Sequence, residues 1–257
     1  MLLPPIHGTC TQQDFYIYAA CDTQYFAEFG EAFVNSIRRN TSAGIHLHLF
    51  NPDEAQVLTC HRLGATVTWE SAPLTLFKSA ADTVLTPTQL DRTLNAMGKG
   101  GDRSMVERIQ KTYYACARFI RLQEIFNPAV TVLELDVDAV VRKNFPRLEE
   151  NCDFYIHHIS GKKARFLAGG LYLNANSNSL QFLAEYAKQL KSYIERDYIY
   201  WGLDQDLLDP IVPKYKHAQL PISYIDWNMN SDSYVWTAKG TRKELEIFKA
   251  EKQKYTV

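Results

Sequence analysis

The fold is decided by the stretch Val130-Thr131-Val132-Leu133-Glu134-Leu135-Asp136-Val137-Asp138. Its mainly apolar first six residues predict a buried strand, and Asp136 stands where that strand ends. In a parallel α/β sheet, ligands gather at the carboxyl ends of the strands. Two carboxylates at positions i and i+2 can converge there on one divalent cation and leave coordination positions for a diphosphate. The alternative, a solvated turn, is disfavoured because the apolar pair Val140-Val141 follows directly.

The residues before this stretch repeat a strand and helix pattern. This alternation predicts parallel strands joined by right-handed crossovers. The expected strands are Phe15–Ala20, Ile45–Phe50 and Thr66–Trp69, and the expected helices run from Phe26 to Ile37, between Pro52 and Gly64, and from Val106 to Ile120.

The segment from Ser71 to Arg103 has no sustained hydrophobic period and carries Gly98, Gly100 and Gly101, so we expect a long mobile connection there.

The rest of the chain predicts further elements. These are strands at Phe154–His158 and at Phe166–Leu173, the second interrupted by Gly169-Gly170, a helix from Leu180 to Tyr193, and a charged surface helix from Lys239 to Lys254.

Composition excludes several classes of protein. The chain has 257 residues with 28 basic and 29 acidic side chains, so its net charge of −1 provides no general attraction for nucleic acid. No run of ~18 apolar residues and no leader pattern is present, which predicts a cytoplasmic protein without a transmembrane segment. The five cysteines are scattered and odd in number, so neither a disulfide framework nor a zinc site is expected.

A nucleotide base and its phosphates have candidate partners in this sequence. Tyr25 at a strand-to-helix junction can stack on a base, while Asp22 and Gln24 offer an acceptor and an amide to its edge. The plain alternative for Asp22 is a helix N-cap. Arg118 can reach a diphosphate or sugar oxygen with its planar fork, or it can lie along a helix surface.

A sugar has candidate partners as well. Gly169-Gly170 inside an apolar strand indicates close approach of a ligand, or a bulge without one. Asp204 and Gln205 follow Trp201-Gly202, an aromatic that can flank a sugar; their alternative is the acidic first turn of a helix. His157-His158 can line an acceptor cleft or can be ordinary strand-end residues.

Five blocks in order along the chain resemble the GT-A fold glycosyltransferases, in particular glycosyltransferase family eight with its lipopolysaccharide galactosyltransferases and glycogenin. They span nearly the whole chain, from Asp14 to about Lys243. The blocks are Ala19-Ala20-Cys21-Asp22-Thr23-Gln24-Tyr25, Tyr114-Ala115-Cys116-Ala117-Arg118-Phe119, Val132-Leu133-Glu134-Leu135-Asp136-Val137-Asp138, Phe166-Leu167-Ala168-Gly169-Gly170-Leu171 and Leu203-Asp204-Gln205-Asp206.

The resemblance implies a fold and a reaction. The fold would be an α/β, GT-A-like single domain, 1–257, with a mixed, mainly parallel central sheet flanked by helices. Residues 14–143 would form the nucleotide-sugar half, 144–240 the acceptor half and 241–257 a charged helical tail. A hexosyl group would pass from a nucleoside diphosphate, with uridine expected, to a hydroxyl of a glycan, a lipid-linked acceptor or a protein, with retained configuration.

The resemblance also implies roles for individual residues. Asp136 and Asp138 would hold Mn²⁺ or Mg²⁺, and Asp204 and Gln205 would lie near the anomeric carbon. The implied nucleotide-sugar contacts are Ala20, Asp22, Gln24, Tyr25, Arg118, Asp136, Val137, Asp138, Ala168, Gly169 and Gly170.

The sequence departs from the family pattern in two places. Leu167 stands where the family usually has an asparagine, and the C-terminal histidine that completes the metal shell in many members is missing from the segment 234–240. We therefore expect Lys239 to take over part of the charge neutralisation on the leaving diphosphate.

Two other functions fit parts of the same pattern. A sugar nucleotidyltransferase would need a glycine-rich basic phosphate loop after the first strand, where this chain has Cys21-Asp22-Thr23-Gln24. A carbohydrate- or nucleotide-binding module that has lost catalysis is compatible with the missing histidine.

Overall fold

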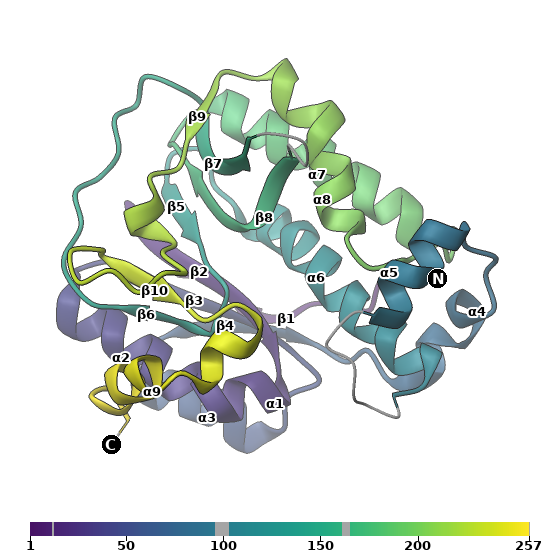
Figure 1. The fold of residues 1–257 in the computed structure, drawn as a ribbon, viewed down its shortest axis with the longest axis horizontal. Helices are drawn as coiled ribbons and strands as arrows, with labels where there is room; N and C mark the ends of the chain where they lie inside the picture. The colour runs from purple at the N-terminus through teal and green to yellow at the C-terminus, as the bar shows by residue number, and fades with distance from the viewer. Residues whose placement is uncertain (12, 96–102, 161–164, 257) are drawn as a thin grey trace.

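The computed structural model describes residues 1–11, 13–95, 103–160 and 165–256. Within them, a central sheet has eight strands in the order β1-β4-β3-β2-β5-β8-β7-β9 (Figure 1). Four neighbouring pairs are parallel and three antiparallel, so the sheet is mixed and mainly parallel, as predicted. The strands are β1 His7–Thr9, β2 Phe15–Asp22, β3 Gly44–Phe50, β4 Thr66–Glu70, β5 Thr131–Glu134, β7 Phe154–Ile159, β8 Arg165–Leu173 and β9 His217–Gln219; a separate two-stranded sheet pairs β6 Ala139–Val141 with β10 Val235–Thr237.

Helices connect these strands, and the sequence fixes several of their ends. Asp53 and Gln56 form a capping box at the start of α3, and Gly64 ends it in the left-handed conformation with φ 84°. Ser104 and Glu107 cap α6 in the same way. The helical elements are α1 Thr23–Tyr25, η1 Phe26–Gly30, α2 Glu31–Asn40, α3 Glu54–Leu63, η2 Leu74–Phe77, α4 Lys78–Ala81, α5 Pro87–Asn95, α6 Met105–Ile125, α7 Ser177–Glu195, α8 Leu203–Ile211, η3 Val212–Lys214, η4 Ile222–Tyr224, η5 Gly240–Glu244 and α9 Glu246–Gln253.

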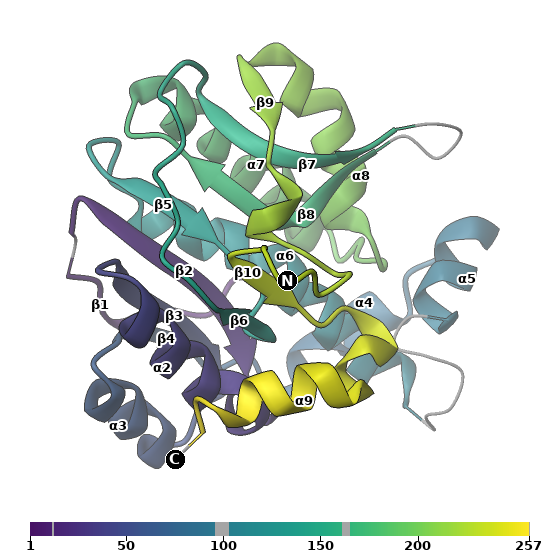
Figure 2. The ribbon, with the colours of Figure 1, turned by 60° about the vertical axis from the view of Figure 1, so that its left-hand side comes forward.

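The sheet is buried on both faces, because helices cover each of them (Figures 1 and 2). Ile17 and Ala19 of β2 point into a core shared with α2 and α3, whereas Tyr16 and Tyr18 point into a core shared with α6 and α7. This alternation along one strand explains why β2 reads as a continuous apolar run. None of the described helices is both long enough and apolar enough to cross a bilayer.

Two expectations about local structure were wrong. The segment from Ser71 to Arg103 contains η2, α4 and α5 rather than a structureless connection, while Gly98, Gly100 and Gly101 lie outside the described residues. The charged tail is not one helix: it forms the 3-10 helix η5 and then the α-helix α9, and it does not lie wholly on the surface because Phe248 and Glu251 are buried. Phe248 belongs to the core under α2, which anchors the tail to the body of the protein.

The two glycines of β8 mark a bulge. Pairing with β7 shifts between Ile156↔Leu171 and His157↔Leu167, so the segment 168–170 is inserted between these pairs. Gly170 adopts φ 144°, and a side chain there would meet Ile225 Cγ2 at 2.7 Å. Gly169 faces the other way, where a Cβ would lie 2.9 Å from Asp136 Oδ2. The bulge therefore turns Gly169 toward the acidic dyad and Gly170 into the core.

His46 lies buried in the middle of β3, in a polar setting that holds its ring in place. Its two ring nitrogens bond the hydroxyls of Thr66 and Thr68 at 2.8 and 3.0 Å. Burial is the main reason why the pKa of His46 falls from 6.5 to about 3, and the charge of nearby His48 adds to the effect. His46 is therefore neutral in the folded protein at every pH near neutrality.

This burial predicts an acid sensitivity. The folded-state pKa of His46 lies below its unfolded value, so below pH 6.5 the unfolded state takes up a proton that the folded state does not. The free energy of unfolding is therefore undiminished above pH 6.5 and decreases as pH falls toward 3. At pH 5 the loss should be about 2 kcal/mol, since each pH unit is worth about 1.36 kcal/mol. Urea unfolding at several pH values in this range gives the free energy of unfolding of the wild type and of His46→Gln. This free energy should fall less steeply with decreasing pH in the variant. Parallel curves would contradict the prediction.

Candidate functional site

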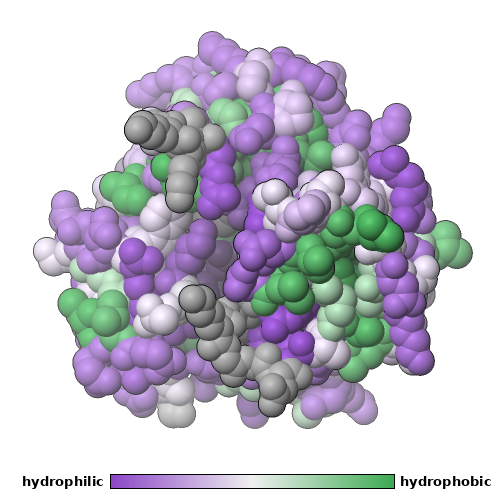
Figure 3. Space-filling view, turned by 45° about the vertical axis from the view of Figure 1, so that its right-hand side comes forward, coloured by the Kyte–Doolittle hydropathy of each residue, from purple (hydrophilic) through white to green (hydrophobic). Residues whose placement is uncertain are grey.

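A cavity of about 290 Å³ opens at the carboxyl ends of β2 and β5. Figure 3 shows one face of the molecule, on which hydrophobic residues gather beside a hollow with mainly hydrophilic walls. The walls of the cavity come from the end of β2, from α6, from the residues after β5, from the bulge of β8, from the start of α8 and from the C-terminal segment around η5.

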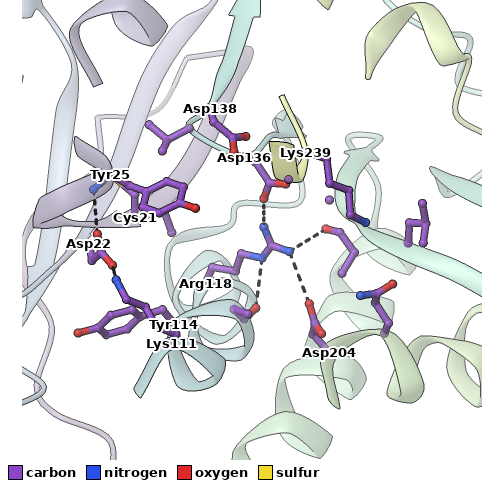
Figure 4. Close-up of a pocket in the computed structure, with 18 of the residues that line it drawn as sticks. Cys21, Asp22, Tyr25, Lys111, Tyr114, Arg118, Asp136, Asp138, Asp204 and Lys239 are labelled. Carbon is purple, nitrogen blue, oxygen red and sulfur yellow. Dashed lines mark hydrogen bonds and ion pairs between the residues drawn. The ribbon is translucent and has the colours of Figure 1, made fainter. Parts of the chain in front are cut away.

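The acidic dyad lies in the middle of this cavity (Figure 4). The side chain of Asp136 is 46% exposed and accepts a hydrogen bond from Arg118 on Oδ1. Asp138 is 10% exposed and pairs through Oδ2 with Lys243 Nζ at 2.7 Å. Burial is the main cause that raises the pKa of Asp138 to about 6, and the charge of Asp136 raises it further.

The dyad offers a donor set that suits a hard divalent cation. Carboxylate oxygens are the ligands that Mg²⁺ and Mn²⁺ accept, and one or two carboxylates with phosphate oxygens suffice for magnesium. Glycine at position 169 leaves room beside Asp136 Oδ2 that a Cβ would fill. Within the described ranges, no group of three or more His, Cys, Asp or Glu side chains is arranged to hold a metal ion. These residues therefore fit a cation that also depends on ligands from a bound diphosphate.

One end of the cavity is built from the junction of β2 and α1. Asp22 caps α1 by accepting from Tyr25 N at 2.9 Å, and its other oxygen pairs with Lys111. The helix N-cap that the sequence left open is thus present, and Asp22 lines the cavity as well. Tyr25 is 37% exposed at this end, with Lys243 Nζ 4.1 Å from its ring centroid. Tyr114 forms the floor of this end from α6.

Arg118 ties the walls of the cavity together. Its Nη1 contacts Asp136 and lies 3.1 Å from Glu134 Oε1, and its Nη2 lies 3.6 Å from Asp204 Oδ2. Further hydrogen bonds run to backbone carbonyls, from Nη2 to Ala168 O and from Nε to Ala115 O, both at 3.2 Å. Its side chain is only 11% exposed, so Arg118 acts as a buried centre of the site rather than as a surface arginine.

The other end of the cavity is built from the start of α8. Asp204 is buried, and burial is the main cause that raises its pKa. Gln205 has a buried Oε1 that finds no hydrogen-bond partner among the described residues. The acidic first turn expected as the plain alternative is therefore present too, but Asp204 and Gln205 face the cavity beside Trp201.

Helix α5 supports this second end from outside. Arg92 makes a double hydrogen bond to Asp206 at 2.8 and 2.9 Å, and Trp201 N donates to Thr93 Oγ1 at 3.0 Å. Gly202 adopts φ 88° and lies so close to Arg92 Nη2 that a Cβ would approach to 2.3 Å. The glycine thus allows α5 to pack against the turn that carries Trp201 and Asp204.

The C-terminal segment closes the cavity with two lysines. Lys239 Nζ lies 5.7 Å from the ring centroid of Trp227, and Lys243 Nζ bonds both Asp138 and Tyr25 Oη at 2.7 Å. Thr237, on the strand just before them, has a buried Oγ1 without a hydrogen-bond partner in the part of the chain described. The segment therefore brings the ammonium group of Lys243 to the dyad.

Most of the residues predicted from the sequence meet in this cavity. Gln24 does not: it is exposed on α1 and is not part of the wall. Gly170 does not either, because the bulge directs it toward Ile225. Those that line the cavity are Ala20, Asp22, Tyr25, Arg118, Asp136, Val137, Asp138, Ala168, Gly169, Asp204, Gln205 and Lys239.

Sequence reasoning assigned no role in a site to four charged or aromatic side chains of the cavity wall, Lys111, Tyr114, Trp227 and Lys243. Lys111 and Tyr114 precede Arg118 by seven and four positions, which places all three on one face of a helix. That spacing could have identified them. Trp227 lies in an irregular segment and Lys243 in the short 3-10 helix η5. The pairing of β10 with β6 brings this part of the chain beside the dyad, where Ala238 N donates to Asp138 O at 3.2 Å.

Comparison with known proteins places this fold. Neither a protein-family model nor a curated protein matches the sequence. Among solved structures, the galactosyltransferase LgtC in complex with donor and acceptor sugar analogs is similar with a TM-score of 0.51 and 15% identity, over 94% of this chain and 96% of LgtC.

Two further glycosyltransferases are similar over part of their own length. The bifunctional WbbM gives a TM-score of 0.50 and 16% identity over 96% of this chain but only 46% of WbbM. GlyE of Streptococcus pneumoniae TIGR4 gives 0.50 and 14% over 94% of this chain and 61% of GlyE. The chain therefore shares the fold of these glycosyltransferases, and the predicted GT-A-like architecture is confirmed.

Proposed function

We propose that this protein is a glycosyltransferase that moves a hexosyl group from a nucleoside diphosphate sugar, with uridine as the nucleoside, to an acceptor hydroxyl. The observation that carries the proposal is the single cavity in which the acidic dyad, Arg118 and two C-terminal lysines meet Asp204 and Gln205. Carboxylates and cations at the carboxyl ends of parallel strands suit a metal-bound diphosphate, and buried polar groups next to an indole suit a sugar.

The donor would lie along the cavity from Tyr25 to Gln205. The base would sit at the end formed by Tyr25 and Tyr114, whose rings offer apolar surface. The diphosphate would lie at the dyad, within reach of Lys239 and Lys243. Because the Arg118 guanidinium touches Asp136 and lies 3.6 Å from Asp204, the diphosphate and the sugar would be held on either side of one side chain.

Asp136 and Asp138 would hold Mn²⁺ or Mg²⁺ together with the donor phosphates. Such an ion, when bound, offsets the negative charge that develops on the leaving nucleoside diphosphate. Lys243 already neutralises Asp138. Any cation at the dyad therefore shares that carboxylate with a lysine, and we expect tight metal binding only when the diphosphate adds its own oxygens.

The chain's own residues would orient the reacting groups. Gln205 Oε1, buried and without a partner among the described side chains, can accept a hydrogen bond from a sugar hydroxyl. Asp204 would face the anomeric carbon from the same wall. The configuration would be retained, by a covalent carboxylate or by departure and attack on the same face.

A donor hydrolysis assay tests the proposal against its two alternatives. A transferase is expected to release uridine diphosphate slowly from a uridine diphosphate hexose when manganese is present. A nucleotidyltransferase would need pyrophosphate to turn over the nucleotide sugar. A catalytically silent module would bind the nucleotide sugar and be stabilised by it, but would not turn it over. Thermal shift measures the binding itself, since a ligand at 100 times its dissociation constant adds ~2.7 kcal/mol of stability. Absence of both turnover and binding for all nucleotide sugars would refute the proposal.

The two C-terminal lysines should differ in their effects. For Lys239→Ala we expect turnover to fall about 10- to 100-fold, because a charged hydrogen bond to the leaving phosphate is lost, with a near-native melting temperature. Lys243→Ala also unpairs the buried Asp138, so its melting temperature should fall as well. Lys191→Ala, at a half-exposed position on α7, is the control. Unchanged turnover in Lys239→Ala would leave Lys243 as the phosphate-binding lysine.

A further inference from the structure

Trp227 lies on the cavity wall and has no part in the donor binding proposed above. It follows η4, and its backbone is fixed because the buried Asp226 accepts hydrogen bonds from Asn228 N at 2.7 Å and Asn230 N at 2.8 Å. The indole is partly exposed to the cavity, with Lys239 Nζ 5.7 Å from its centroid. A rigid, flat apolar surface is therefore presented next to a cation.

His157 supports this surface from the end of β7. Its ring meets Trp227 edge to face, with centroids 5.0 Å apart and an interplanar angle of 88°. The backbone N–H of His158 donates to Gln219 Oε1 at 3.1 Å, which fixes the orientation of that amide. The Gln219 Nε2 then donates to His157 Nδ1 at 2.9 Å.

These contacts determine where His157 carries its proton. Since Nδ1 accepts from Gln219, the neutral ring has its hydrogen on Nε2. Burial lowers the pKa of His157; a hydrogen bond with the backbone of Leu220 opposes this, and the charges of His158 and Lys239 lower the pKa again, so the ring is neutral near pH 7. The indole of Trp227 is thus bordered by one neutral N–H donor and one ammonium group.

We propose that the acceptor is a carbohydrate whose terminal pyranose lies on the indole of Trp227, with its hydroxyls bound by His157 Nε2 and Lys239 Nζ. The inference rests on the proposed transferase function. A pyranose has an apolar C–H face and a rim of hydroxyls, which matches an aromatic plane bordered by donors. In the transfer, the acceptor oxygen bonds to the anomeric carbon, the bond from that carbon to the phosphate oxygen breaks, and the hydroxyl proton is released with the nucleoside diphosphate.

Steady-state transfer to defined acceptors tests this inference. The acceptors are p-nitrophenyl pyranosides of glucose, galactose, mannose and N-acetylglucosamine, a serine- and threonine-containing peptide, and a polyprenyl phosphate. For a pyranoside that is used, Trp227→Ala should raise the acceptor KM about tenfold, and by more than it changes the donor KM, since an aromatic contact and its buried area are lost. Trp227→Phe should restore part of the affinity, and His157→Gln should raise the acceptor KM less.

Trp69→Ala is the matched control, since that indole lies on β4, stacked on His7 and outside the cavity wall. Use of the peptide or polyprenyl phosphate alone, or an unchanged acceptor KM in Trp227→Ala at a near-native melting temperature, would overturn the inference. If the wild type turns over no donor, the transferase proposal fails, but saturation-transfer NMR still tests whether a pyranose binds to the Trp227 indole. Methyl pyranosides should then give saturation-transfer signals with the wild type and Trp69→Ala but not with Trp227→Ala. If no methyl pyranoside gives a signal with the wild type, the inference about pyranose binding is overturned.

Discussion

Asp136→Asn and Asp138→Asn should each reduce sugar transfer by at least about a hundredfold, because each removes a negative charge from the proposed metal and diphosphate site. Asparagine has nearly the same shape as aspartate. The loss should therefore appear in turnover and in manganese binding with a nucleoside diphosphate, rather than in gross unfolding.

The two variants should differ in stability. Asp136 is nearly half exposed, so Asp136→Asn should melt close to the wild type. Asp138→Asn leaves the Lys243 ammonium without its buried carboxylate partner, so its melting temperature should be lower. Asp232→Asn, at an exposed position, controls for loss of an acid in general. If either dyad variant turns over donor at the wild-type rate under limiting manganese, the metal assignment is wrong.

The sequence was most informative at strand β5, which belongs to the central sheet and is followed directly by the acids of the site. The apolar run before Asp136 predicts a buried strand, and the rule that ligands collect at carboxyl ends predicts where its acids lie. The same logic brought Asp22 and Arg118 to the cavity, because each stands on an element whose period is strong. Helix α3 was bracketed nearly correctly by Pro52 and Gly64 for similar local reasons.

Prediction failed where long-range packing decides the structure. Helix α5 is held by Arg92 on Asp206, more than a hundred residues away, so its own sequence gave little sign of an ordered segment. Gly169 and Gly170 are adjacent in sequence but face opposite sides, because the register of β7 and β8 shifts at the bulge. Lys243 was placed in a charged surface helix because nothing local reveals that Phe248 anchors this part of the chain in the core.

The structure adds a structural role for Arg118 to the donor contact expected from the sequence. The sequence left two positions open for its guanidinium, at a diphosphate or sugar oxygen or along a helix surface; in the structure its nitrogens contact Asp136, Glu134 and backbone carbonyls. Glu134 is fully buried, and burial is the main cause that raises its pKa to about 8 even beside this guanidinium. Near pH 7 Glu134 is therefore mostly protonated, and Arg118 balances the charge of Asp136, with Asp204 3.6 Å from its Nη2.

Arg118→Met should accordingly lower both stability and activity. Removing one partner of a buried ion pair costs about 3–5 kcal/mol, because the remaining charge is left uncompensated. Arg118→Lys keeps the charge but cannot reach Asp136, Glu134 and two carbonyls at once, so it should recover part of the stability and little of the turnover. Urea unfolding and donor hydrolysis measure the two effects separately.

A second substitution separates structural support from donor binding. Glu134→Gln removes the buried carboxyl that Arg118 faces at 3.1 Å. Above pH 8, where this carboxyl is charged, Arg118→Met combined with Glu134→Gln should unfold at higher urea than Arg118→Met alone. Turnover should stay low in the double variant, because the guanidinium that lies between Asp136 and Asp204 and holds their positions is still missing. If Arg118→Met instead melts like the wild type and weakens a uridine diphosphate hexose far more than uridine, the guanidinium serves the donor directly and the buried carboxylates are stabilised by other means.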